Sequence, residues 1–222
     1  LSSTHVAWGT IRLEPTWMSL CESAGHAAAI VQARDMGMLV RHDHATLPYL
    51  VLEWLPGATL DSVLHDEARR KVAPRSLVKA IKFLDPIAEA VSVAHSQGVV
   101  HRDLKPDNIV IVADPDTAGG ERVKILDFGI AKFNEGAEGR RQTTTGTAIG
   151  TPTYMSPEQC EGLPKISDRA DTYSLGVMMF EMLTGNPPFQ AEGTASLLRQ
   201  HIVKPPPSLP PTVPAGLAAL VS

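Results

Sequence analysis

The sequence is poor in cysteine and has no surplus of positive charge. Its two cysteines, Cys21 and Cys160, lie far apart among 222 residues and form no C-x-x-C pair. This argues against a disulfide framework or a zinc site and favours a reducing cytoplasm. The formal charge of −4 argues against a nucleic-acid-binding protein whose affinity comes from a broad basic face.

Long apolar runs are also missing. No stretch approaches the roughly 18 apolar residues that a membrane-spanning helix needs, so we expect no membrane segment in this chain. Apolar residues make up 43% and charged residues 20%, which is ordinary for a soluble globular protein. A chain of this length can bury a core of its own as one large domain or two small ones. Composition leaves the oligomeric state unknown.

Two segments have the pattern of buried helices. Residues 77–97 repeat apolar side chains at helical spacing, and Gly98 follows where a C-terminal glycine cap belongs. The core-facing positions of this helix are expected to be Leu77, Ile81, Leu84, Ile87, Ala88, Val91, Ala94 and His95. Residues 173–183 are almost entirely apolar, which predicts a helix buried on most sides.

Short apolar runs predict several strands. Residues 49–55 stop at Pro56-Gly57, which indicates a buried strand ending in a turn. Residues 109–112 and 123–126 flank a turn-forming segment, which predicts a small hairpin. The apolar residues between 30 and 40 suit one strand or a bent hairpin.

Two other segments lack helical or strand periodicity. Residues 134–151 are rich in Gly, Thr, Arg and Glu and are expected to form an exposed loop. Residues 205–214 contain six prolines, which suits a surface connection between helices or a polyproline ligand.

Four motifs carry the chemistry. Residues 101–108 read H-R-D-L-K-P-D-N, and residues 127–129 read D-F-G after the second strand of the hairpin. Residues 150–158 read G-T-P-T-Y-M-S-P-E, and residues 168–176 read D-R-A-D-T-Y-S-L-G. In this order they resemble the catalytic loop, metal-binding triplet, activation-segment end and central helix of eukaryotic-type (Hanks-type) serine/threonine protein kinases. The Y-M-S-P-E-Q form at 154–159 is typical of the bacterial members, and the resemblance covers about residues 26–220.

The resemblance implies an α+β, two-lobed protein kinase-like fold. Residues 1–55 would form a truncated, β-rich N-lobe, and residues 56–222 a mainly helical C-lobe without its last helices. The implied activity is transfer of the ATP γ-phosphate to serine or threonine hydroxyls of protein substrates, with ATP and Mg²⁺ as cofactors, in the cytoplasm. Phosphoryl transfer needs mainly positioning and charge neutralisation. The protein therefore has to supply only a proton acceptor, a cation and hard oxygen ligands.

Specific roles follow from positions within the motifs. Asp103 would accept the proton of the substrate hydroxyl, and Lys105 would place a positive charge on the transferring phosphoryl group. Asn108 and Asp127 would supply oxygen ligands to Mg²⁺. Thr151 would order the catalytic loop near Asp103 and Lys105 and favour Ser/Thr over Tyr substrates.

The adenine contacts are implied by hinge position. Glu53 and Leu55 would offer backbone groups to the base, and Val110 would form the floor of its pocket, although core packing explains Val110 almost as well.

Regulation by phosphorylation is implied by Arg102, which precedes the catalytic aspartate. A phosphothreonine needs a guanidinium partner, and Arg102 with Lys132 would provide it. The candidate sites are Thr143, Thr144, Thr145 and Thr147. The alternative is a polar loop whose threonines indicate exposure only.

The sequence departs from the kinase pattern before the hinge. It contains no G-x-G-x-x-G motif, its first lysine is Lys71, and Trp17 stands where the partner glutamate of the strand lysine is expected. Two alternatives to an active kinase therefore stay open. The chain would be a catalytically impaired, pseudokinase-type binding module, or a truncated kinase remnant. At the other end, Glu158 is expected to lack the arginine that usually pairs with it.

Overall fold

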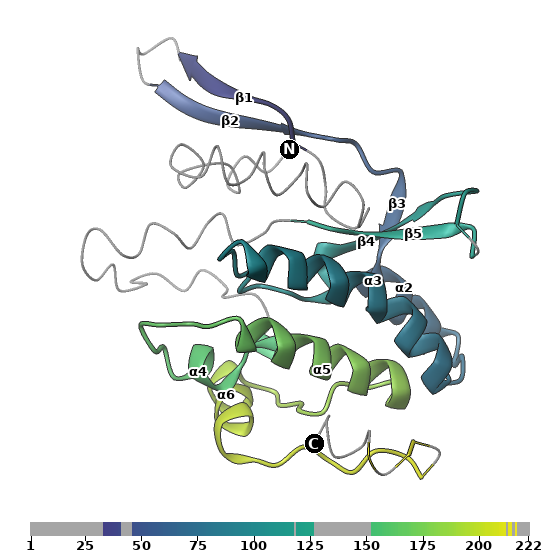
Figure 1. The fold of residues 1–222 in the computed structure, drawn as a ribbon. Helices are drawn as coiled ribbons and strands as arrows, with labels where there is room; N and C mark the ends of the chain where they lie inside the picture. Colours follow the sequence, from purple (N-terminus) through teal and green to yellow (C-terminus); the bar gives the residue numbers. More distant parts are fainter. Residues whose placement is uncertain are drawn as a thin grey trace.

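Two small sheets and a set of helices make up the part of the chain that the structure describes. The computed structural model describes residues 33–40, 46–117, 119–126 and 152–211, with positions 213, 214 and 216. In the view of Figure 1 the two sheets lie above the long helices. This confirms the predicted α+β class.

The first sheet is a two-stranded antiparallel pair. Strands β1 (Ala33–Val40) and β2 (Thr46–Leu52) pair with Gly37 opposite Tyr49. The strand predicted at 49–55 exists, but it ends at Leu52, and the prediction of burial is wrong for Val51 and Trp54, which are 45% and 88% exposed. An apolar run predicts a strand from side-chain shape, whereas burial depends on a second layer that packs against the strand.

The second sheet is three-stranded and antiparallel. Its order is β3 (Gly57–Thr59), β4 (Ile109–Ala113) and β5 (Glu121–Ile125), so the predicted hairpin is confirmed. Gly57 was expected in a turn, but it is the first residue of β3. A Cβ atom on Gly57 would lie 2.1 Å from the Ile111 carbonyl oxygen, so only glycine allows β3 to approach β4 here.

Helix α3 (Leu77–Ser96) confirms the predicted long helix. Its buried face contains Ala80, Leu84, Ile87, Ala90, Val91 and Ala94. Ile81 is 42% exposed and Ala88 is exposed, which corrects their expected place in the core. At about 100° per residue, these two positions lie at the edges of the stripe centred on Leu84 and Ile87. Gly98 follows with φ +76°, the left-handed conformation that ends many helices.

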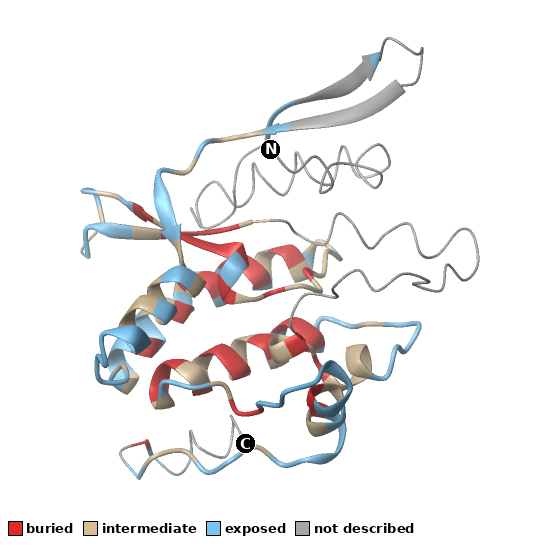
Figure 2. Cartoon of the chain, turned by 180° about the vertical axis from the view of Figure 1, so that it is seen from behind, coloured by how far each residue is buried: buried red, intermediate tan, exposed pale blue. Residues whose placement is uncertain are grey.

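Helix α5 (Arg169–Thr184) is the most buried helix element of the core, as its apolar sequence predicts. It begins four residues before the predicted start and ends at Thr184, and Gly185 caps it with φ +82°. Buried residues concentrate on α3, α5 and β4–β5 (Figure 2). Full burial of each Leu, Ile or Met side chain in this cluster stabilises the fold by about 1.5–3 kcal/mol.

Sequence periodicity missed three shorter helices, namely α2 (Leu60–Arg69), α4 (Pro157–Cys160) and α6 (Thr194–Val203). Helix α2 begins after Thr59, whose Oγ1 accepts a hydrogen bond of 3.2 Å from the Ser62 amide. Residues 204–210 form neither helix nor strand and are largely exposed, as a surface connection requires. The loop predicted at 134–151 lies outside the described residues.

Candidate active site

A buried carboxylate on α5 holds the H-R-D segment in place. Asp171 is fully buried. Its Oδ2 accepts the His101 amide at 2.8 Å and lies 2.7 Å from His95 Nε2, and its Oδ1 accepts the Arg102 amide at 2.8 Å. The consecutive backbone amides of His101 and Arg102 therefore both donate to one side chain of α5. This fixes the direction in which the chain continues toward Asp103.

The ring of His101 ties the same segment to the end of β5. Its Nε2 donates to the Leu126 carbonyl at 2.8 Å, and its Nδ1 accepts the Asp103 amide at 3.3 Å. The ring is fully buried. The catalytic-loop motif is thereby linked to the residue before Asp127. Arg102 adopts φ +65°, and its carbonyl accepts a 2.6 Å hydrogen bond from Gln159 Nε2. A non-glycine residue persists in this conformation only where its surroundings hold it.

Three of the predicted catalytic residues meet at this loop. Lys105 Nζ lies 2.9 Å from Asp103 Oδ2, and Asn108 Nδ2 donates to the Asp103 carbonyl at 2.8 Å. The Asp103 side chain is 40% exposed and that of Lys105 25%, so both remain accessible to a substrate. Pro106–Asn108 form a 3-10 turn that brings Asn108 back toward Asp103.

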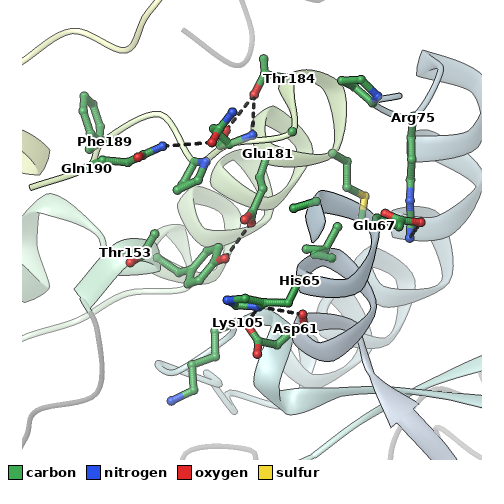
Figure 3. Close-up of a pocket in the computed structure, with 18 of the residues that line it drawn as sticks. Asp61, His65, Glu67, Arg75, Lys105, Thr153, Glu181, Thr184, Phe189 and Gln190 are labelled. Carbon is green, nitrogen blue, oxygen red and sulfur yellow. Dashed lines mark hydrogen bonds and ion pairs between the residues drawn. The ribbon is translucent and has the colours of Figure 1, made fainter. Parts of the chain in front are cut away.

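A cavity of about 1170 Å³ opens beside the loop (Figure 3). Lys105 and Asp107 of the loop line it, together with α2, the end of α5 and the connection from α5 to α6. Asp61, His65 and Lys105 lie at one end and Thr184, Phe189 and Gln190 at the other. The cavity is large enough for a segment of extended peptide.

The wall of this cavity contains a carboxylate that the sequence analysis did not single out. Glu181 Oε2 accepts a 2.6 Å hydrogen bond from the Tyr154 hydroxyl. Burial raises the pKa of Glu181 above its ordinary value, the Tyr154 hydrogen bond opposes this, and the nearby Asp61 carboxylate adds to it. Burial, and then Glu181 itself, raise the pKa of the Tyr154 hydroxyl. Tyr154 falls in the motif at 150–158 and Glu181 in the apolar segment 173–183, so their positions, though not their contact, were visible in the sequence.

His65 borders the same wall from α2. Its Nδ1 lies 3.0 Å from the Asp61 carbonyl oxygen. That hydrogen bond, and then the Asp61 carboxylate, raise the pKa of His65 above 6.5.

Comparison with known proteins shows the family to which this chain belongs. The model of the protein kinase domain matches residues 16–209. The chain belongs to the protein kinase family. It is 42% identical over 173 residues to the serine/threonine-protein kinase Pkn1 of Myxococcus xanthus, covering 78% of this chain and 23% of Pkn1.

Two mycobacterial kinases are similar over a comparable span. Identity is 38% over 184 residues to PknB of Mycobacterium tuberculosis, which covers 83% of this chain and 27% of PknB. It is 38% over 192 residues to PknA of the same species, which covers 86% of this chain and 41% of PknA. The chain thus spans less than half the length of these relatives. These relatives are serine/threonine-protein kinases, and the part of them that this chain matches is a protein kinase domain.

One of the two expected metal ligands, Asn108, lies within the described residues. The Asn108 amino group is used by Asp103, which leaves the side-chain oxygen Oδ1 as the atom able to bind Mg²⁺. Among the described residues no group of three His, Cys, Asp or Glu could hold a metal ion. Mg²⁺ is commonly held by one or two protein oxygens together with substrate phosphates, and Asn108 Oδ1 is an oxygen of this kind.

The residues expected around adenine lie at the junction of the two sheets. Val110 is 6% exposed on β4, opposite Lys124 of β5. The Glu53 side chain is bound to Lys124 Nζ at 3.0 Å. The Leu55 carbonyl accepts the Gly57 amide at 3.0 Å, which leaves the Leu55 amide as the available group.

The remaining predicted site residues of the kinase domain are not covered by the structure. Asp127, Thr143, Thr144, Thr145, Thr147 and Thr151 lie outside the described residues. The predicted partnership of Arg102 with a phosphothreonine therefore stays a prediction. Glu158 on α4 is half-buried. In the described part of the chain, no helix has both the length and the apolar character needed to cross a bilayer.

Proposed function

We propose that this kinase domain transfers the γ-phosphoryl group of ATP to serine or threonine hydroxyls of proteins, with Asp103 as the proton acceptor. The observation that supports this is the cluster of Asp103, Lys105 and Asn108, anchored through the H-R-D backbone to buried Asp171. A pre-positioned cluster of this kind favours phosphoryl transfer, because the reaction gains most from orientation and charge neutralisation.

In the proposed reaction the substrate hydroxyl oxygen forms a bond to the γ-phosphorus as the bond to the departing ADP oxygen breaks. Asp103 accepts the hydroxyl proton. Lys105, 2.9 Å from Asp103 in the structure, is close enough to bind the same phosphoryl group. Asn108 Oδ1 would bind Mg²⁺, which when bound neutralises phosphate charge.

The cavity beside Lys105 and Asp107 is the proposed place for the protein substrate. It is continuous with the catalytic loop and is walled by α2 and α5. A peptide lying in it would bring a side-chain hydroxyl close to Asp103. Because the co-substrate is ATP, we also place the domain on the cytoplasmic side.

Asp103→Asn tests the proposal. It removes the proton acceptor but keeps the shape of the side chain, so we expect kcat to fall by about 10²–10⁴-fold. The affinity for Mg²⁺-ATP should change little, since Asp103 contacts the hydroxyl rather than the nucleotide. Turnover is measured by phosphate transfer to a generic Ser/Thr substrate, and affinity by calorimetry. The matched control is Asp116→Asn, an exposed aspartate in the β4–β5 turn, which should leave both values unchanged.

A binding module is the second candidate. It is favoured by the absence from this sequence of a G-x-G-x-x-G motif and of any lysine before Lys71. Without these groups, nucleotide binding is expected to be weak. Suppose that the folded domain binds nucleotide but transfers no more phosphate than Asp103→Asn does. That result would support the binding module and reject the proposed kinase activity.

A further inference from the structure

Glu53 occupies the connection between the two sheets. It lies between the end of β2 and the start of β3, where the chain passes from one sheet to the other (Figure 1). Its carboxylate is only 15% exposed and has partners on both sides. Oε1 lies 3.0 Å from Lys124 Nζ of β5, and Oε2 lies 3.9 Å from the Arg34 guanidinium of β1.

Lys124 approaches Glu53 from the face of the sheet that carries Val110. Val110 of β4 and Lys124 of β5 are directly opposite each other, so their side chains are on the same face of the sheet. The neighbouring pair, Ile109 and Ile125, points to the other face and is fully buried in the core. The Lys124 side chain is 10% exposed. It therefore lies beside the expected adenine floor rather than in the core or in open solvent.

The burial of this pair distinguishes it from the surface ion pairs of the chain. Taking a carboxylate and an ammonium out of water is unfavourable, and good mutual geometry is needed to offset it. The Glu53–Lys124 pair meets that condition at 3.0 Å. The Arg34 contact does not, because its side chain is 61% exposed and its distance is 3.9 Å. Of these two cations Lys124 is thus the closer to Glu53, and the two residues are 71 positions apart in sequence.

We infer that the Glu53–Lys124 ion pair positions the backbone of residues 53–55 over Val110 for binding of the adenine base. The inference rests on the proposed function, because it assumes that the domain binds a nucleotide there. Neither side chain contacts the reacting atoms, so both are positioning residues. Loss of the pair frees the connecting segment to move relative to β4, and the base then binds a less ordered site.

The first test measures Mg²⁺-ADP affinity of the full 222-residue chain by calorimetry. In Lys124→Met we expect the Kd to rise about tenfold, as the loss of a hydrogen bond to a charged group predicts. kcat at saturating ATP should stay within about twofold, because the catalytic loop is untouched. Lys124→Arg should restore affinity, since it keeps the charge and the donor.

Arg122→Met is the matched control. Arg122 has the same charge, strand and face as Lys124, but it pairs with Asp114 near the hairpin turn. Its replacement should leave nucleotide affinity unchanged. Equal losses in Arg122→Met and Lys124→Met would mean that positive charge on this face, rather than the ion pair, attracts the nucleotide, and would overturn the inference.

A double variant separates positioning from simple destabilisation. Lys124→Met alone leaves Glu53 buried with its closest partner removed, and the domain could lose stability for that reason. Glu53→Gln with Lys124→Met removes both charges. If positioning matters, affinity stays low in the folded double variant. If the double variant binds as tightly as the unaltered chain, the isolated charge caused the loss and the inference is wrong.

Hydrogen exchange provides a readout that does not depend on nucleotide binding. The amides of Glu53, Trp54, Leu55 and Gly57 should exchange faster in Lys124→Met than in Arg122→Met, with the helices unchanged. Unaltered exchange there would refute the inference even if the domain proves inactive. Conversely, faster exchange with normal binding and turnover would leave the proposed function intact and reject the role in positioning.

Discussion

Replacement of Asp171 addresses how the catalytic loop is held on α5. Asp171→Ala removes the acceptor for the His101 and Arg102 amides and for His95 Nε2. A buried donor left without a partner costs about 1–3 kcal/mol. Three donors, of which Arg102 N and His95 are only partly buried, give an expected loss of about 3–5 kcal/mol in the free energy of unfolding. Since small domains are stable by about 5–15 kcal/mol, the loss is a large part of the total.

Urea unfolding followed by circular dichroism measures this loss as a fall in midpoint at unchanged slope. Asp171→Asn keeps one acceptor oxygen and should lose less, about 2 kcal/mol. Asp168→Asn is the control, because Asp168 begins the same helix but is exposed and makes no side-chain capping bond. It should change stability by less than about 0.5 kcal/mol.

An Asp171→Ala free energy of unfolding within about 1 kcal/mol of that of the unaltered chain would refute this role of Asp171. Such a result would mean that water satisfies the His101 and Arg102 amides as well as the carboxylate does. A folded Asp171→Ala domain should also transfer phosphate more slowly, because Asp103 follows the two freed amides directly. Normal turnover in that variant would show that the loop keeps its geometry without the anchor.

Two further predictions concern packing and pH. Gly57→Ala should lower stability by about 1–3 kcal/mol in urea unfolding, because the new Cβ would lie 2.1 Å from the Ile111 carbonyl oxygen, whereas Gly119→Ala, with no atom within 4 Å, should be neutral. Burial lowers the pKa of His201 below 6.5 while its ring contacts the Tyr173 hydroxyl, so the unfolded chain binds more protons at mildly acidic pH. Its contribution to stability is therefore full above about pH 6.5 and is lost as the pH falls toward the folded-state pKa. His201→Gln should flatten the pH dependence of stability below about pH 6.5, and an unchanged slope would contradict the assignment.

The long helix and the hairpin could be predicted because their signals are local. Residues 77–97 show a 3.6-residue apolar period, and the strands at 109–112 and 123–126 are short β-branched runs around a turn. Helices α2 and α6 were missed, since most of their residues are not buried and their apolar stripes are correspondingly narrow. Trp54 shows the opposite failure, because its aromatic apolar run predicts a buried strand although the residue is 88% exposed.

The cluster proposed to be catalytic could be predicted from sequence for the same reason. Asp103, Lys105 and Asn108 lie within five residues of one another, so a tight loop brings them together whatever the rest of the chain does. Their mutual contacts follow from spacing and motif, and family membership follows from the order of the motifs.

The partners that hold this cluster were decided only by the tertiary structure. The Asp171 carboxylate reaches the Arg102 amide across 69 positions, Lys124 reaches Glu53 across 71, and Tyr154 reaches Glu181 across 27. No sequence period links such residues, because each contact depends on how a helix or strand packs against an element formed elsewhere in the chain. The sequence by itself determined which chemical groups stand at the loop, whereas packing determined what fixes them in place and which carboxylates are buried beside them.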